Sequence, residues 1–319
     1  MPRHLLNVED LEVKFALRFG DITAIDGVSF SLDKGEKLGL VGESGAGKSV
    51  TGFSIINLIS KPGFISKGKI TFEGDEISAY SDSKMRQIRG NRISMIFQDP
   101  MMTLNPVFTI GMQMTEVLHA HRKISKNQAR EIALEKLKKV HIPSPEKRLA
   151  QYPHELSGGM RQRIIIAISL LTDPAIIIAD EPTTALDVTI QAEIMDLLQE
   201  LCESDNMALI LITHDLGVVS LVTETIAVMY AGKIIEYGKT DDVINNPQHP
   251  YTQGLIASIP GSIKPGDKLT QIPGMMPTLK DIPPGCAFNP RCEFRDDICT
   301  IKTPELKQIN GTMVACHMR

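Results

Sequence analysis

Apolar and polar residues alternate near the start of the chain in a way that predicts β-structure. Val28, Phe30 and Leu32 are separated by serines, and this period of two is typical of a strand with one buried face. Residues 37–41 are mostly apolar and are bounded by glycines, which predicts a short strand buried on both faces.

Three more short apolar runs follow, at residues 93–97, 175–179 and 208–213. Between the last two, residues 190–202 have apolar side chains at helical spacing, the pattern of a helix with one buried face. A strand, a helix and a strand in this order predict a largely parallel α/β sheet.

The middle of the chain has a different pattern. Ser125 and Gln128 have the spacing of a capping box before an apolar helix face, and we expect residues 99–171 to form a helical subdomain inserted into the α/β core. Prolines become frequent after Gly238 and predict an irregular C-terminal extension. The predicted domains are residues 1–238 and 239–319.

Composition narrows the possible functions. The net charge of −4 gives no basic surplus for nucleic acid, so we expect no nucleic-acid partner. The N-terminus has no pattern of a secretory signal. The longest apolar run, residues 164–171, is only about one-third of a membrane span. We therefore expect a soluble protein that reaches a membrane only through a partner.

The strand at 37–41 leads into a phosphate-binding sequence. Residues 42–49 fit the pattern G-x-x-x-x-G-K-[ST] at every position. Glycines let backbone N–H groups surround an anion, and the following helix adds a favourable partial charge. Lys48 is expected to reach the β- and γ-phosphates of a nucleotide, and the Ser49 hydroxyl to ligate Mg²⁺. The predicted nucleotide contacts are Gly42, Ser44, Gly45, Ala46, Gly47, Lys48, Ser49 and Val50.

Two carboxylates follow the apolar run at 175–179. Asp180 ends the predicted strand, where a carboxylate can hold Mg²⁺, and Glu181 is the next residue. Glu181 is placed to orient or deprotonate the water that attacks the γ-phosphate. Together with the phosphate loop, this pair predicts Mg²⁺-dependent ATP hydrolysis.

A second anion site is predicted at the start of another helix. Ser157 is a favourable N-cap, and Gly158 and Gly159 leave their N–H groups uncovered. An ordinary capped helix gives the two glycines no purpose, because glycine weakens a helix. We expect this helix start to face a nucleotide that is bound by another subunit.

These motifs resemble those of the ATP-binding cassette (ABC) ATPases, over roughly residues 4–238. The resemblance implies a P-loop NTPase fold with a mostly parallel core sheet, an antiparallel β lobe and an inserted helical subdomain. Residues 156–162 are similar to the family's signature motif, and residues 185–187, ending in Asp187, to the loop that crosses the dimer seam.

The resemblance also implies roles for single residues. Gln98 looks like the glutamine that links Mg²⁺ and the attacking water to the helical subdomain. Glu181 would be the catalytic base, and His214 would sense the γ-phosphate. Phe19 is the candidate for the aromatic residue that stacks on adenine; a place in the core is the alternative. The motifs are complete, so we expect an active site.

Residues 246–252 and 99–106 resemble the ATPases that drive dipeptide and oligopeptide import. Near Gln98 the chain is rich in methionine. These side chains would form an adaptable surface for a helix of a membrane subunit, or pack inside the helical subdomain. The methionines are Met101, Met102, Met112 and Met114.

Four of the five cysteines fall in the last 34 residues, with five, six and sixteen residues between them: Cys286, Cys292, Cys299 and Cys316. This is neither the paired spacing of zinc ribbons nor a ferredoxin pattern. By residue type, a [4Fe–4S] cluster, Zn²⁺ and free thiols remain open. Residues 286–292 are similar to the tails of dipeptide-transporter ATPases that carry an iron–sulfur cluster, which favours a structural [4Fe–4S] cluster. The fifth cysteine, Cys202, is expected to be buried.

The implied function is that of an ATP-hydrolysing subunit of a dipeptide or oligopeptide importer. It would lie peripherally on the cytoplasmic face of the membrane. Its partners would be a second ABC ATPase, identical or related, two permease subunits and, indirectly, an extracytoplasmic substrate-binding protein. The alternatives are a nickel or glutathione importer, a soluble ABC ATPase acting in translation or repair, and a redox-sensing module built on the cysteine tail.

Overall fold

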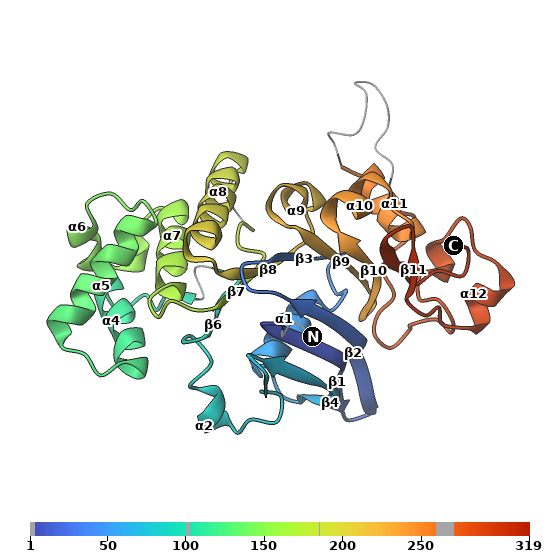
Figure 1. Ribbon diagram of the computed structural model, residues 1–319, viewed down its shortest axis with the longest axis horizontal. Helices are drawn as coiled ribbons and strands as arrows, with labels where there is room; N and C mark the ends of the chain where they lie inside the picture. Colours follow the sequence, from blue (N-terminus) through green and yellow to red (C-terminus); the bar gives the residue numbers. More distant parts are fainter. Residues whose placement is uncertain (1–3, 100–102, 185, 260–270) are drawn as a thin grey trace. The chain divides into compact units, whose positions relative to one another are not determined.

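A computed structural model describes residues 4–99, 103–184, 186–259 and 271–319 of the chain. The chain forms two compact units (Figure 1). The first consists of Met1–Ala79 and Leu211–Arg319, and the second of Tyr80–Ile210. The second unit is therefore an insertion in the sequence of the first.

An antiparallel sheet opens the first unit. Its strands β1 (Leu6–Leu17), β2 (Gly20–Leu32), β4 (Gly63–Phe72) and β5 (Asp75–Glu76) are arranged in the order β2-β1-β4-β5. In β2, Val28, Phe30 and Leu32 are buried whereas Ser29 is exposed. The predicted half-buried strand is thus confirmed, and it belongs to the antiparallel β lobe.

A second set of strands in this unit carries the phosphate loop. Strand β3 (Lys37–Val41) is buried at all five positions and runs parallel to β9 (Thr225–Tyr230). Strand β10 (Lys233–Lys239) follows as an antiparallel neighbour of β9. The helices of the unit are α1 (Lys48–Ile55), α9 (Leu216–Val222), α10 (Thr240–Asn245), α11 (Pro250–Ala257) and α12 (Asp297–Ile301), with a 3₁₀ turn, η3 (Asn289–Arg291).

The second unit contains a parallel pair of strands and most of the helices. Strands β6 (Ile93–Ile96) and β7 (Ile176–Asp180) are parallel, and the fully buried β8 (Ala208–Thr213) begins in this unit beside β7. The helices are α2 (Asp82–Met85), α4 (Ile110–His121), α5 (Lys126–Lys139), α6 (Pro145–Leu149), α7 (Gly158–Ser169) and α8 (Val188–Asp205), with a 3₁₀ turn, η1 (Pro153–Glu155).

The predicted elements of the second unit are confirmed. The capping box is present, because the Ser125 side chain accepts from the Gln128 N–H and the Gln128 side chain accepts from the Ser125 N–H. Residues 190–202 lie within α8, and Cys202 is buried there. None of the described helices is both long and apolar enough to cross a bilayer.

The C-terminal extension contains more regular structure than the sequence predicts. Most of it is irregular, but β11 (Lys307–Ile309) and β12 (Thr312–Val314) form a hairpin, and β12 pairs with β10. Strands of three residues are too short to give a periodic pattern, so their pairing is visible only in the fold.

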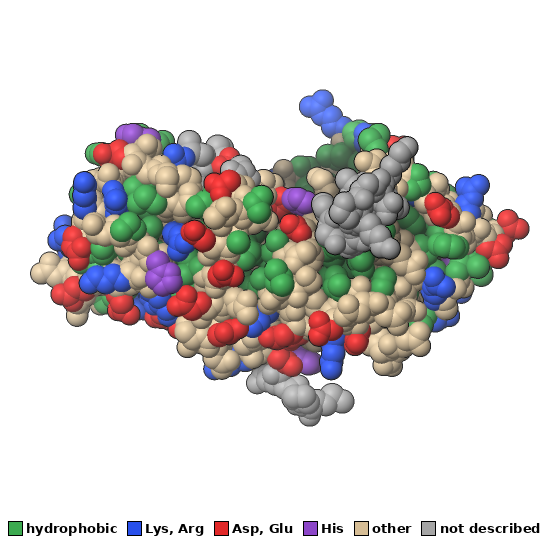
Figure 2. Space-filling view, turned by 90° about the horizontal axis from the view of Figure 1, so that it is seen from above, with side chains coloured by type: hydrophobic (Ala, Val, Ile, Leu, Met, Phe, Trp, Pro, Cys, Tyr) green, Lys and Arg blue, Asp and Glu red, His purple; other side chains and the backbone are tan. Residues whose placement is uncertain are grey.

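On the face in Figure 2, acidic and basic side chains are intermingled.

Candidate active site

The phosphate loop joins β3 to α1 in the first unit. A Cβ atom at Gly42 would lie 2.3 Å from the backbone oxygen of Met229, and Gly47, the N-cap of α1, has a φ of 104°. Both positions require glycine, the first because another strand approaches closely and the second because the backbone is left-handed. These two glycines let the chain turn sharply out of the buried strand.

Lys48 lies within the loop that precedes it. Its side chain is mostly buried, and Nζ donates to the backbone oxygens of Gly42 at 2.8 Å and Glu43 at 3.0 Å. Its ammonium group is therefore inside the curve of the loop, as a phosphate ligand requires. Ser49 and Val50 follow in the first turn of α1, and both are half-buried.

The residues between the two key glycines form a tight turn. Ser44 and Gly45 are exposed, whereas Ala46 is buried. The Ala46 N–H donates to the Glu43 oxygen at 3.1 Å. The predicted loop residues thus form a closed turn with its tip at the surface, where a phosphate group can approach.

Gln98 and Glu181, each predicted to act on the attacking water, are hydrogen-bonded in the second unit. Gln98 Nε2 donates to Glu181 Oε2 at 3.1 Å, and the Thr184 hydroxyl donates to the same oxygen at 2.9 Å. Asp180 is buried at the end of β7. Glu181 has a φ of 45°, a left-handed conformation that side-chain-bearing residues rarely adopt.

Thr184 was not predicted as part of the site. The signal available in the sequence was its position three residues after Glu181, which suits a turn: the Thr184 N–H donates to the Glu181 backbone oxygen at 3.1 Å. The threonine hydroxyl and the Gln98 amide together fix one oxygen of the carboxylate.

The predicted second anion site has the expected helix start. Ser157 is the N-cap of α7, and its side chain accepts from the Met160 N–H at 3.3 Å. Gly158 is exposed and Gly159 half-buried. A Cβ atom at Gly159 would lie 3.0 Å from Ile190, so this glycine also allows α7 to pack closely on α8. The contact of this helix start with a nucleotide remains a prediction.

Asp187 caps α8 by accepting from the Ile190 N–H at 3.0 Å, and Ala185 lies outside the described residues. His214 follows β8 and is exposed. Phe19 is 65% exposed, with Lys280 Nζ 3.7 Å from its ring centroid. The core alternative for Phe19 is therefore wrong, and stacking on adenine stays a prediction.

The methionines differ in environment. Met114 is fully buried in α4, whereas Met112 is 55% exposed. Met101 and Met102 lie outside the described residues. Core packing is thus confirmed for Met114, and only Met112, among the described pair, offers a side chain to a partner.

A buried carboxylate, absent from the sequence-based prediction, organises the tail motif at residues 246–252. Glu236 is fully buried in β10 and accepts from the N–H groups of Gln248 at 2.7 Å and His249 at 3.0 Å. Burial raises the pKa of Glu236. His249 is buried as well, and its Nδ1 accepts from the Tyr251 N–H at 3.0 Å. Burial lowers the pKa of His249 to about 3, so this ring is neutral and caps α11 as an acceptor.

Three aromatic rings pack together where the extension meets β9. Tyr230 lies 4.7 Å from Tyr251 and 5.4 Å from Phe288, measured between ring centroids. Next to them Arg291 pairs with Glu43 of the phosphate loop, with NH1···Oε2 at 2.6 Å and NH2···Oε1 at 2.9 Å. The signal for Arg291 in the sequence was its place between two cysteines.

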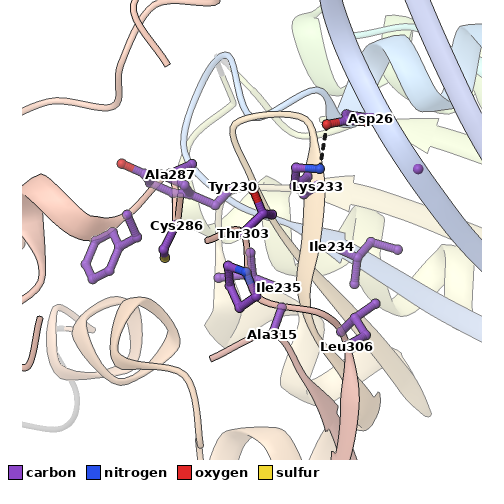
Figure 3. Close-up of a pocket in the computed structure, with 13 residues that line it drawn as sticks. Asp26, Tyr230, Lys233, Ile234, Ile235, Cys286, Ala287, Thr303, Leu306 and Ala315 are labelled. Atoms are coloured by element: carbon purple, nitrogen blue, oxygen red, sulfur yellow. Dashed lines mark ion pairs between the residues drawn. The ribbon is translucent and has the colours of Figure 1, made fainter. Parts of the chain in front are cut away.

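The four C-terminal cysteines are all unpaired as disulfides. Burial raises the pKa of Cys286 to about 11, in spite of a hydrogen bond from the Phe288 N–H that lowers it, and burial also raises the pKa of Cys292 and Cys316. Cys286 lines a cavity of about 140 Å³ together with Tyr230 and Ile235 (Figure 3). Among the described residues, no group of three or more histidine, cysteine or acidic side chains is arranged to hold a metal ion.

The fold and the phosphate loop define a P-loop ATPase. Residues 25–184 match the family model described as ABC transporter, and residues 235–299 match the model described as the C-terminal region of oligopeptide/dipeptide transporters. The chain belongs to the ABC transporter family, as one of its ATPases.

Named relatives match over nearly the whole chain. The oligopeptide transport ATP-binding protein OppD of Bacillus subtilis is 50% identical over 97% of this chain and 87% of its own length. The dipeptide transport ATP-binding protein DppD of the same organism is 51% identical over 92% of this chain and 88% of its own length. The oligopeptide transport ATP-binding protein OppD of Escherichia coli is 47% identical over 98% of this chain and 92% of its own length.

A solved structure shares the fold. It is a dimeric ATP-binding cassette in a post-hydrolysis state, bound to ADP and Pi. It is 28% identical in sequence, with a TM-score of 0.66 over 74% of this chain and 98% of its own length.

Proposed function

We propose that this chain hydrolyses ATP to power the import of dipeptides or oligopeptides across the cytoplasmic membrane. One observation carries the proposal. The similarity to the peptide-transport ATPases named above extends beyond the ATPase core, through the C-terminal region matched at residues 235–299. A likeness confined to the core would have left the kind of transporter open.

The phosphate loop would hold the triphosphate. The ammonium of Lys48, which lies inside the loop, would exchange its backbone oxygen partners for oxygens of the β- and γ-phosphates. Ser49, Asp180 and Gln98 would hold Mg²⁺, which would supply positive charge beside the phosphates. Phe19 would offer a ring face to adenine.

Glu181 would act as the base toward the attacking water. Its Oε2 atom accepts from Gln98 and Thr184, and these two donors would hold the carboxylate in one orientation toward the water. A carboxylate fixed in this way needs little reorganisation when the water attacks. His214 would contact the γ-phosphate from the end of β8.

A second ABC ATPase subunit would complete the site. The helix start at Ser157, Gly158 and Gly159, and the helix cap at Asp187, would face the nucleotide held by the other subunit. We place this pair on the cytoplasmic face of the membrane, where ATP is available, bound to two permease subunits that receive peptide from an extracytoplasmic binding protein. Exposed Met112 supports such a contact.

The test is ATP hydrolysis by the chain reconstituted with its permeases in vesicles, with and without peptide-loaded binding protein. We expect hydrolysis to rise when loaded binding protein is added. Lys48→Ala should lower ATP affinity, and Glu181→Gln should bind ATP normally and hydrolyse almost none. Hydrolysis that ignores the binding protein would reject the transport role, and a fully active Glu181→Gln variant would reject the proposed base.

For the four cysteines we propose a [4Fe–4S] cluster with a structural role. The backbone N–H two residues after the cysteine bonds to the sulfur of Cys286, Cys292 and Cys316, and such N–H···S bonds stabilise cluster thiolates. The raised pKa values mean that thiolates at these positions need a cationic centre.

Iron and sulfide analysis of anaerobically purified protein tests this proposal. We expect about four irons per chain and broad absorption near 400 nm, both lost in the Cys292→Ser variant. Cys202→Ser is the matched control, because this cysteine is buried in α8, and it should leave the iron content unchanged. Colourless protein containing stoichiometric zinc would reject the cluster.

A further inference from the structure

Two residues of the C-terminal extension, residues 239–319, form hydrogen bonds with the phosphate loop. The contact centres on Glu43, the residue after Gly42. Its carboxylate receives both terminal nitrogens of Arg291, at 2.6 and 2.9 Å, and the Tyr251 hydroxyl lies 2.9 Å from its backbone nitrogen, which donates to it. Both partners belong to the extension, and both are more than 200 residues away in sequence.

Arg291 is firmly positioned for this contact. Its side chain is 5% exposed, and Nε donates to the Pro273 backbone oxygen at 2.8 Å. Its NH1 also lies 3.4 Å from the Tyr230 hydroxyl. A guanidinium group held on several sides fixes a carboxylate in one orientation, because its two parallel bonds allow little rotation.

Glu43 connects this contact to the binding lysine. The backbone oxygen of Glu43 accepts from Lys48 Nζ at 3.0 Å and from the Ala46 N–H at 3.1 Å. A displacement of Glu43 therefore moves both the ammonium group and the turn that would receive the phosphates. Residues of the extension thus lie one hydrogen bond from the centre of the loop.

Arg291 is also tied to the cysteines. It directly precedes Cys292, and it ends η3, in which Asn289 donates its side-chain N–H to the Cys286 oxygen at 2.8 Å. The Cys286 N–H in turn donates to the Cys299 oxygen at 2.8 Å. A short, hydrogen-bonded turn thus connects Cys286 and Cys292 to Arg291. Figure 3 shows Cys286 in the same cavity wall as Tyr230.

We propose that Arg291 is a positioning residue for the phosphate loop and couples the cysteine-bearing segment to ATP binding. Whatever the cysteines hold, their state then changes the affinity for ATP, and ATP binding changes the reactivity of Cys286 and Cys292 by the same coupling. The proposal rests on the proposed role of residues 42–49 in binding ATP.

Equilibrium binding of a fluorescent ATP analogue, with Mg²⁺, to the full-length chain tests the positioning role. We expect Arg291→Met and Glu43→Gln each to raise Kd about tenfold, which is about 1.4 kcal/mol, and the double variant to bind no worse than either one. Tyr251→Phe should weaken binding less. Lys69→Met, which breaks an ion pair with Glu76 in the antiparallel sheet, is the matched control and should bind normally.

A purely structural role predicts a different result. In that case Arg291→Met would lower the melting temperature while the folded protein kept its Kd, and this result would overturn the proposal. If Arg291→Met does not fold, Arg291→Lys keeps the charge but not the paired bonds, and it should still raise Kd. Lys48→Ala separates the ATP-binding role of residues 42–49 from the positioning role of Arg291. If Lys48→Ala binds ATP normally, the proposed role of the loop fails. If Lys48→Ala binds weakly but Arg291→Met binds normally, only the positioning role is rejected.

The coupling has its own readout. A chelator selective for iron and zinc over Mg²⁺ is added together with iodoacetamide, so that Cys286 and Cys292 are alkylated as soon as any metal that they hold is released. Alkylation, measured by mass spectrometry, should be about fivefold slower with ATP and Mg²⁺ than without, the size of a modest coupling between sites. In Arg291→Met this ATP effect should disappear at saturating nucleotide. An ATP effect that is missing from the wild type, or of equal size in the variant, would overturn the coupling.

Discussion

Glu181 combines a rare backbone conformation with a fixed carboxylate. Its φ of 45° lies in the left-handed region, which costs a side-chain-bearing residue some free energy. Its Oε2 atom accepts from both Gln98 and Thr184, so the backbone conformation and the two donors act on the same group. The conformation is a feature that no sequence pattern reveals, since the chain has an ordinary Asp-Glu-Pro at this point.

Thr184→Val tests the contribution of the threonine hydroxyl. The change keeps the shape of the side chain and removes one hydrogen bond to the carboxylate, which is worth about 0.5–1.5 kcal/mol. We expect kcat for ATP hydrolysis to fall about three- to tenfold with unchanged ATP affinity. Thr115→Val is the control, because the Thr115 hydroxyl bonds only to backbone oxygens of its own helix among the contacts described. Equal kcat values for the two variants would contradict the role of Thr184.

His249 gives the protein a predictable sensitivity to acid. Its native pKa of about 3 lies below the ordinary 6.5, so the unfolded chain takes up a proton before the native protein does. Native stability is therefore fully present above pH 6.5 and falls as the pH drops toward 3. His249→Asn keeps an N-cap acceptor but cannot take up the proton.

Urea unfolding at pH 7.5 and pH 5 measures this difference. Between these two values the wild type should lose about 2 kcal/mol more than His249→Asn, since one pKa unit corresponds to about 1.4 kcal/mol. Comparing the two proteins cancels the opposite contribution of Glu236, whose pKa is raised. Parallel pH profiles would mean that the native protein protonates His249 without loss.

Among the helices and strands, the sequence predicts those in which apolar residues form an uninterrupted run or a regular repeat. Strands β3 and β8 are buried at every position and appear in the sequence as short apolar runs, and α8 appears as a repeat of three to four. Strand β1 was missed because polar residues such as Glu9, Asp10 and Glu12 interrupt its pattern. Its pairing with β2 includes register shifts between Val8 and Lys14, and such irregularities destroy the simple alternation on which strand prediction depends.

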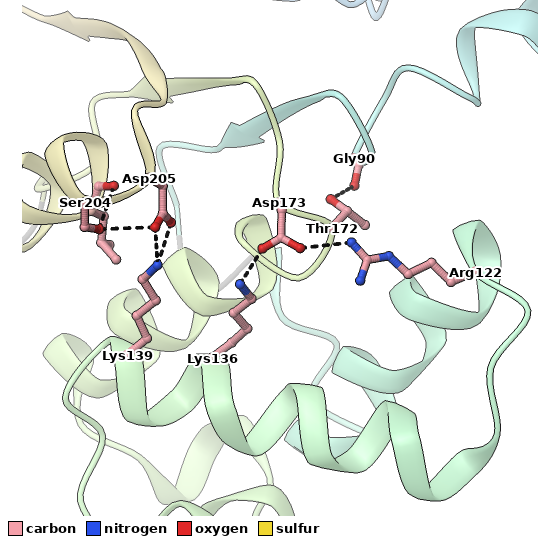
Figure 4. A network of polar contacts seen from close by, with 9 residues as sticks. Gly90, Arg122, Lys136, Lys139, Thr172, Asp173, Ser204 and Asp205 are labelled. Carbon is pink, nitrogen blue, oxygen red and sulfur yellow. Dashed lines mark hydrogen bonds and ion pairs between the residues drawn. The ribbon is translucent and has the colours of Figure 1, made fainter. Parts of the chain in front are cut away.

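Helices α4 and α5 are tied to the loop before β7 by one carboxylate. Asp173 accepts from Lys136 Nζ at 2.6 Å and from Arg122 NH2 at 3.0 Å (Figure 4). Burial alone would raise the pKa of Asp173, but the bonds to these two cations lower it overall. The contact joins segments more than 35 residues apart in sequence, and it could not have been predicted from either helix alone.

Asp173→Asn tests this tie with little disturbance of the backbone. The φ of Asp173 is 55°, a conformation that asparagine also tolerates. We expect the variant to lose about 1 kcal/mol of unfolding free energy at pH 7, because two ion pairs are weakened: Asp173 itself is largely exposed, whereas Lys136 is buried. Since the folded pKa is lowered, the stabilisation is present above the unfolded value of 3.8 and disappears as the pH falls below it.

Urea unfolding followed by circular dichroism at pH 7 and below pH 4 gives the comparison. Asp205→Asn is the control: Lys139 is the cation that bonds its carboxylate (Figure 4), so its effect should be smaller. A loss from Asp173→Asn that stays constant across this pH range would show that packing, rather than charge, holds the helices.

At the scale of the whole chain, the ATPase core was predictable because its motifs are local in sequence. The role of the extension was not. Its hairpin pairs with β10, its Arg291 reaches Glu43, and its Tyr251 reaches the same residue. Each of these contacts depends on how distant segments fold together, and no periodicity or spacing in the chain encodes it.

The proposed sharing of each ATP site between two subunits leads to a complementation experiment. Lys48→Ala removes the lysine of the phosphate loop but leaves the helix start at Ser157 intact. Ser157→Asp keeps a favourable N-cap and places a negative charge where the γ-phosphate would lie. Each variant alone should hydrolyse almost no ATP. In a pair made of one copy of each, the loop of the Ser157→Asp chain meets the intact helix start of the Lys48→Ala chain.

Random pairing of equal amounts gives mixed pairs half of the time, each with one intact site of two. The mixture should therefore recover about one quarter of the wild-type rate at the same total concentration, as expected for twofold-symmetric pairing. The rate should rise more than linearly with protein concentration. A mixture as inactive as its components would mean that two copies of this chain do not form a shared site. The second half of the site would then have to come from a different ATPase subunit, whose addition should restore one of the two sites in either variant.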